Sequence, residues 1–113
     1  MFVLELSPSY HYPVKFDLPT DQGPKPVEFM AYFDRLAQHE VDELVGQTRS
    51  GAVNDQELVH RVLRGWDGVQ QADGQPLAYG PEGLDTLLNI VPVRPAIVMA
   101  WFNSLKHDPS VKN

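Results

Sequence analysis

The spacing of apolar residues changes along this chain, from a period of two before residue 37 to a helical period after it. The stretches 14–18 and 27–33 alternate apolar with polar residues, and the cluster 20–23 between them suits a turn. Such alternation is typical of strands with one buried face. The pattern predicts an antiparallel hairpin, to which residues 2–6 are a candidate third strand.

The second alternating stretch carries an ambiguity. Phe29, Phe33 and Leu36 also stand at helical spacing, so a helix over this stretch stays open beside the preferred strand. The chain of 113 residues fits one domain. We assign it to residues 1–107, with a β-rich part over 1–36, a helical part over 37–107, and a flexible tail at 108–113.

Four helices are expected after residue 37. Asn54 and Glu57 form a capping-box pattern, in which two side chains satisfy free backbone N–H groups, so a helix is predicted over 55–64. An earlier helix would end at Gly46. A third helix would begin at Pro81, and its last apolar residue would be Val91, before Pro92. The last helix would begin at Pro95. The expected fold class is α+β, a small N-terminal antiparallel hairpin or sheet followed by about four helices.

Charge and composition exclude several classes of function. Fifteen acidic against nine basic residues give a net charge of −6, and the basic residues are scattered, so no nucleic-acid footprint is present. No apolar run reaches the roughly 18 residues that a membrane span needs. The chain has no cysteine, which fits a reducing compartment. We expect a cytoplasmic protein without nucleic-acid or membrane partners.

Catalytic constellations are sparse. His39-Glu40 begins like a zinc-protease motif, but the second histidine four residues on is missing. His60 lies beside an apolar stripe, where a surface histidine or a satisfied half-buried one is the better interpretation, and His11 and His107 fall in terminal segments. No nucleophile elbow or phosphate loop is present. The expectation is therefore no enzyme, no cofactor and no metal site.

The last predicted helix is unusually apolar. Trp101 and Phe102 are adjacent and point about a quarter-turn apart, so burying both would need packing partners on two sides. Exposed apolar patches usually mark a partner surface. The predicted partner-binding residues are Val98, Trp101, Phe102 and Leu105, with pure core packing as the alternative. Trp66, just after the helix that ends at Gly65, is expected to plug a seam between helices.

A family resemblance rests on ordered pieces in the second half of the chain, whereas residues 1–25 carry no part of it. The pieces run Asp55-x-Glu57-Leu58-Val59-x-x-Val62-Leu63-x-Gly65-Trp66-x-Gly68-Val69, Asp73-Gly74-x-Pro76-Leu77-x-Tyr79, Pro81-Glu82-x-Leu84-x-x-Leu87-Leu88 and Val93-Arg94-x-Ala96-Ile97-x-x-Ala100-Trp101-Phe102, with Phe33-x-Arg35-Leu36 upstream. In this order the chain resembles the tail assembly chaperones of long-tailed, siphovirus-type bacteriophages and prophages.

The resemblance implies a protein that binds and solubilises the tape-measure protein during tail morphogenesis and self-associates. Tail-tube subunits, a further partner, would then replace it, so it would act in the cytoplasm of the bacterial host and be absent from the mature virion. Two other functions stay open. The chain could be another phage structural or head–tail completion protein, or a small bacterial adaptor protein.

Overall fold

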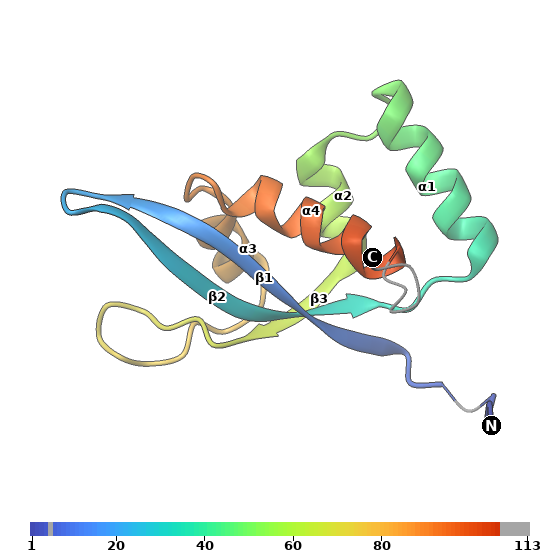
Figure 1. Cartoon of the computed structure of the whole chain (residues 1–113), viewed down its shortest axis with the longest axis horizontal. Coiled ribbons are helices and arrows are strands. Elements are labelled where there is room, and N and C mark those ends of the chain that lie inside the picture. Colours follow the sequence, from blue (N-terminus) through green and yellow to red (C-terminus); the bar gives the residue numbers. More distant parts are fainter. Residues whose placement is uncertain (5, 107–113) are drawn as a thin grey trace.

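The computed structural model describes residues 1–4 and 6–106 (Figure 1). It confirms the α+β class, with a three-stranded antiparallel sheet and four helices. The predicted tail at 108–113 and His107 lie outside the described residues. In chain order the elements are β1 (Ser9–Thr20), β2 (Gly23–Asp34), α1 (Gln38–Ser50), α2 (Asp55–Val62), β3 (Leu63–Asp67), α3 (Pro81–Leu88) and α4 (Val93–Lys106).

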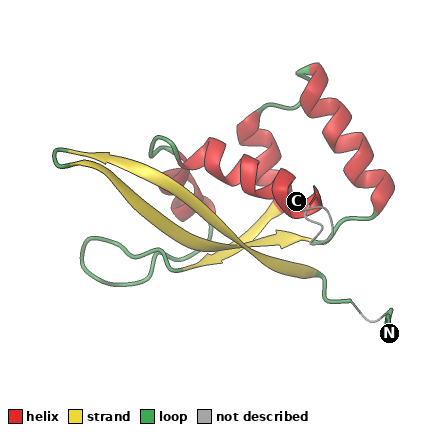
Figure 2. Cartoon of the chain, viewed as in Figure 1, coloured by secondary structure: helices red, strands yellow, loops and turns green. Residues whose placement is uncertain are grey.

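The predicted hairpin is confirmed as a ribbon of two 12-residue strands, and the second stretch is a strand rather than a helix. Its register runs from the pair Ser9↔Asp34 to the pair Thr20↔Gly23. The twisted ribbon extends well past the helices (Figure 2). Residues on its buried face, among them Val14 and Phe29, alternate with exposed ones as the period of two requires.

Prolines determine which backbone groups of the hairpin face outward. Pro13, Pro19, Pro24 and Pro26 all fall on cross-strand pairs of one parity in the register. Because proline has no N–H and hydrogen-bonded pairs alternate with non-bonded ones, all four occupy the non-bonded class. The outer edge of β1 therefore lacks donors at positions 13 and 19, which blunts it against pairing with further strands.

The third strand is not the one that the sequence pattern indicated. Residues 63–67 form β3, which pairs with β2 at Met30–Phe33 on the side away from β1, whereas the described residues 1–4 and 6 form no strand. The predicted helix over 55–64 therefore ends at Val62. Gly65 is a poor helix former, and β2 offers a free row of backbone partners. Because Gly65 has no side chain, it leaves room for the Tyr32 ring. A Cβ at position 65 would lie 3.2 Å from that ring.

Helix ends agree with the sequence at some positions and not at others. The capping box is confirmed, since Glu57 N–H donates to Asn54 at 2.8 Å and Asn54 N–H donates to Glu57 at 3.0 Å. The helix expected to close at Gly46 continues to Ser50, where Gly51, with φ of 85°, ends it.

Helices α3 and α4 meet at Pro92, which interrupts the helical run as expected. α3 ends at Leu88, so Val91 lies beyond it and is 79% exposed rather than part of its apolar stripe. α4 begins at Val93, two residues before the expected start at Pro95. A proline in the first turn costs no hydrogen bond, because the first N–H groups of a helix are unpaired anyway.

The core lies between the sheet and the helices. α1, α2 and α4 lie on one side of the sheet (Figure 1), and α4 packs against β1, α2 and α3. The largest fully buried side chains of the core include Trp101, Phe33, Leu58, Leu63 and Ile97. Within the described residues no single helix is long and apolar enough to cross a membrane, and α3 with α4 meets that test only as a pair bent by 101°.

Candidate partner-binding surface

The four residues predicted to bind a partner do not form one exposed patch. Trp101 has 0% exposure and belongs to the core, so its side chain offers no surface to a partner in this conformation. Val98 and Phe102 are half-buried against the core, and the Phe102 ring meets the Trp101 ring edge-on at 5.1 Å between centroids. Leu105 is 38% exposed.

The reason for this burial is that α4 has packing partners on two sides. The sequence left open whether so small a domain could supply them. β1 covers one side of α4 and α2 another, with α3 at its start. Val93, Ile97, Ala100 and Trp101 are therefore all buried. Core packing, the alternative interpretation, describes most of the predicted set.

The exposed face of α4 lies a fraction of a turn away from the predicted residues. It carries Pro95, Met99 and Asn103 at intervals of four, the spacing that places side chains on one helical face. Met99 is 62% exposed, the most of any large apolar side chain on this helix. Sequence reasoning missed Met99, although its i±4 relation to Pro95 and Asn103 was visible.

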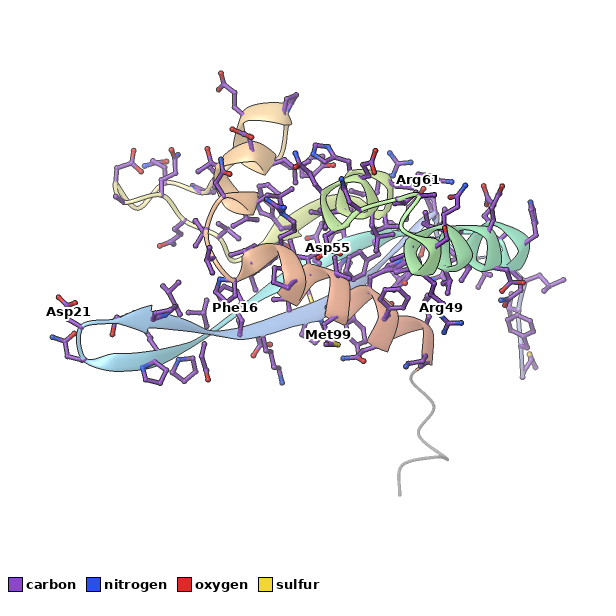
Figure 3. All side chains as sticks on the ribbon, turned by 90° about the horizontal axis from the view of Figure 1, so that it is seen from above. Phe16, Asp21, Arg49, Asp55, Arg61 and Met99 are labelled. Atoms are coloured by element: carbon purple, nitrogen blue, oxygen red, sulfur yellow. The ribbon has the colours of Figure 1, made fainter. Side chains whose placement is uncertain are left out.

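This face borders a groove of about 480 Å³, which we call the α4–β1 groove. Its walls are the exposed face of α4 and the central part of β1, and Figure 3 shows Met99 on α4 beside β1, with Phe16 toward the hairpin tip. The lining is largely apolar, with Lys15 as its charged residue: Tyr12, Pro13, Lys15, Phe16, Pro92, Pro95, Ala96, Met99, Ala100 and Asn103. Its volume falls in the range of roughly 300–1,000 Å³ typical of binding clefts.

Leu105 lies at a second, smaller hollow of about 350 Å³ near the end of α4. Tyr10 and Ser104 close part of it through a 2.7 Å hydrogen bond between their hydroxyls. The Arg35 guanidinium lies 5.2 Å from the centroid of the Tyr10 ring. This hollow joins the strand ends to α4 and mixes polar with apolar walls, so it suits an apolar ligand less well than the α4–β1 groove does.

Trp66 is buried, as expected, but not in a seam between helices. It lies on β3, 7% exposed, and its ring meets the Tyr79 ring edge-on at 5.1 Å. Tyr79 donates from its hydroxyl to the Leu63 carbonyl at 2.7 Å. Gly83 of α3 lies against this layer, since a Cβ there would be 3.4 Å from the Trp66 ring. Residues 63–83, one part of the stretch that carries the family resemblance, are thus joined as strand, connector and helix.

Charged groups form a network around Asp34 rather than a reactive cluster. Arg64 lies 3.0 Å and Arg61 4.0 Å from the Asp34 carboxylate, and Arg61 also lies 3.6 Å from Glu40. The hydrogen bond to Asp34 raises the pKa of Arg64, which keeps an always-charged group charged. These exposed pairs join β2, α1, α2 and β3, and such pairs contribute little stability individually.

Among the described residues, His11, His39 and His60 belong to three different elements, β1, α1 and α2. His39 and His60 are exposed, and His11 stacks on Tyr32 with the rings 4.2 Å apart. The hydrogen bond that the Tyr32 hydroxyl donates to Asp67 raises the pKa of Tyr32. Over residues 1–4 and 6–106, no group of three or more histidine and carboxylate side chains could hold a metal ion.

Comparison of the chain with family models, curated proteins and solved structures finds no match.

Proposed function

We propose that this chain is a tail assembly chaperone of a long-tailed bacteriophage or prophage. It binds the tape-measure protein, keeps it dissolved during tail morphogenesis, associates with copies of itself, and carries out no catalysis. The observation that carries the proposal is apolar surface on an acidic chain, namely the α4–β1 groove with Met99 62% exposed at its rim, on a chain of net charge −6. The family resemblance implies the client.

The groove suits an apolar stripe on a helix. A helix presents side chains at i, i+3, i+4 and i+7 along one face, and such anchors dock in apolar grooves of partner proteins. Phe16 and Met99 would contact those anchors from the two walls, and Lys15 would meet a carboxylate at the margin. A methionine at the rim adapts to anchors of different shape, which suits a client with a varied apolar stripe.

Net charge supports the same role. A long helical client with bare apolar stripes would aggregate through them. Chaperone copies bound along it would cover those stripes and add −6 each, so the complexes would repel one another and stay dispersed. A chaperone that later gives way to tail-tube subunits needs contacts that can be reversed.

The test is co-expression with the tape-measure protein of the same phage or prophage, measuring the soluble fraction of the client. The native chain should raise that fraction severalfold over client alone. Met99→Glu, which places a charge on the groove, should remove most of the gain. Gln47→Glu is the matched control, because it adds the same charge at an exposed position of α1 and should leave the gain intact. A client no more soluble with the native chain than without it would reject the chaperone role.

Purified virions distinguish the remaining functions. A chaperone should be absent from them by mass spectrometry while present in lysates of producing cells. Detection of the chain in virions at a fixed ratio to the tail-tube subunit would indicate a structural or head–tail completion protein instead. A cellular protein that binds the chain tightly when the tape-measure protein does not would indicate an adaptor.

A further inference from the structure

The first residues of the chain form an apolar arm, residues 1–6, of which the structure describes 1–4 and 6. Phe2 is 74%, Leu4 81% and Leu6 55% exposed, so the described arm leaves its large side chains in water. Single exposed apolar residues are ordinary, but a contiguous run indicates a surface that another molecule covers. The question is what covers it.

The arm points away from the groove of its own chain. The Arg35 backbone N–H donates to the Pro8 carbonyl at 2.8 Å, and Arg35 Nε donates to the Ser7 carbonyl at 2.8 Å. These two hydrogen bonds hold residues 7 and 8 in line with β1. The arm accordingly leaves the domain beyond the end of the sheet, opposite the hairpin turn (Figure 1). To reach its own α4–β1 groove the arm would have to reverse direction before residue 7.

A second copy of the chain matches the arm in chemistry. The charged residue among the groove lining is Lys15, and the charged side chain in the arm sequence is Glu5, of opposite sign. The rest of the arm sequence is apolar, as is most of the groove. We propose that the arm of one copy docks in the α4–β1 groove of a second copy. This deepens the self-association included in the proposed function and rests on it for its biological role.

The edge of β1 limits how the arm binds. Pro13 and Pro19 lack the outward N–H groups that an added strand would need, so side chains rather than a continuous backbone ladder make the contact. Stable interfaces bury roughly 800 Å² per partner, more than one short arm supplies. A reciprocal exchange, in which each copy gives an arm and receives one, doubles the buried area and closes as a two-fold dimer. The arm and an apolar client would then compete for the same groove.

Cysteine cross-linking tests the contact directly, because the chain contains no cysteine. A chain carrying Leu4→Cys is mixed with one carrying Met99→Cys and oxidised, and the disulfides are identified by mass spectrometry. The expected product is a link between position 4 of one copy and position 99 of the other. Gln47→Cys replaces Met99→Cys in the control, and its link to position 4 should be at least tenfold less abundant. Equal yields from the two mixtures would overturn the proposal.

Sedimentation of the native chain and of Leu4→Glu tests the energetic role of the arm. The native chain should form dimers, and Leu4→Glu should raise the dissociation constant of the dimer at least tenfold. The circular dichroism spectrum should not change, because Leu4 is 81% exposed. A monomeric native chain, or a dimer that Leu4→Glu leaves intact, would overturn the arm–groove contact. A disulfide formed within one copy by a chain that carries both Leu4→Cys and Met99→Cys would also overturn it.

Client solubility separates this inference from the proposed function. Leu4→Glu should still solubilise the tape-measure protein, because it leaves the groove free, whereas Met99→Glu should lose both dimerisation and client. If Leu4→Glu becomes monomeric while the native chain solubilises no client, the arm contact stands and the chaperone role fails. If the client is solubilised but Leu4→Glu dimerises as strongly as the native chain, the chaperone role stands and the arm contact fails.

Discussion

The indole Nε1 of Trp66 donates a 2.8 Å hydrogen bond to the carbonyl oxygen of Leu77, across the connector that leads from β3 to α3. Tyr79, two residues further on, returns a hydrogen bond to Leu63 at the start of the same strand. The connector is therefore fastened to β3 at two points, although it contains little regular structure of its own. α3 reaches its place on the core through this fastening.

Trp66→Ala should lower the free energy of unfolding by about 3 kcal/mol or more, as large-to-small changes in a core do. The change removes a buried indole, its hydrogen bond to Leu77 and its contact with Tyr79. Trp66→Phe keeps the aromatic contact and should cost less. Urea unfolding followed by circular dichroism measures both. Equal midpoints for Trp66→Ala and the native chain would show that the fastening does not stabilise the domain.

Gly83→Ala should also destabilise the domain, because a Cβ at this position would lie 2.1 Å from the Ala78 carbonyl oxygen. The backbone must move to relieve that overlap, and overpacking of this kind costs roughly 1–3 kcal/mol. Gly46→Ala is the matched control. It lies inside α1 with nothing within 4 Å, and should raise stability by about 0.5–1 kcal/mol through better helix propensity. Thermal unfolding of the two variants should shift in opposite directions.

Elements that depend on local sequence patterns were predicted correctly, whereas the strand that depends on pairing with a distant part of the chain was missed. Alternation over 14–18 and the Asn54–Glu57 box act within a few residues, and both appear in the structure. β3 depends instead on a free edge of β2 that lies 30 residues or so upstream, and residues 63–67 are too short to show a period of two clearly. Tertiary pairing therefore ended a helix that the apolar pattern extended to residue 64.

The candidate site shows the same division. An apolar surface on the last helix was predictable from its composition, but the side that faces water depends on where β1 and α2 pack. Trp101 was predicted as a binding residue from its place beside Phe102 on an apolar helix, whereas the structure buries its large ring in the core. Met99 stands one turn from Pro95 and Asn103, a relation that the sequence contains but that only the packing of α4 makes informative.

Tyr32→Phe should show a stability difference that depends on pH. The hydrogen bond donated to Asp67 raises the folded pKa of Tyr32 above the value of about 10 that tyrosine has in an unfolded chain. The stabilisation is therefore complete below about pH 10 and is lost as the pH rises through the folded pKa. The gap in unfolding free energy between the native chain and Tyr32→Phe should shrink across that range.

The titration of the Tyr32 hydroxyl is followed from about pH 8 upward. A gap that stays constant from pH 8 to beyond about 11 would show that the hydroxyl of Tyr32 contributes nothing through its proton. A gap that widens with pH would contradict the direction of the pKa shift. Denaturant titrations at several pH values provide the readout.

A charge should destabilise the fold on the packed side of α4 and leave it nearly unchanged on the exposed side. Phe102→Glu puts a carboxylate on a half-buried ring position against Trp101, and should cost roughly 2 kcal/mol or more in unfolding free energy. Met99→Glu changes a side chain that is 62% exposed, and should alter stability by no more than about 0.5 kcal/mol.

Phe102→Glu alone would therefore be a poor test of partner binding, because loss of binding would follow from loss of folding. Met99→Glu separates the two effects, provided that its unfolding midpoint matches that of the native chain. If Phe102→Glu were as stable as the native chain and Met99→Glu unfolded, the assignment of the exposed and packed faces of α4 would be reversed, and the α4–β1 groove would lose its place as the binding surface.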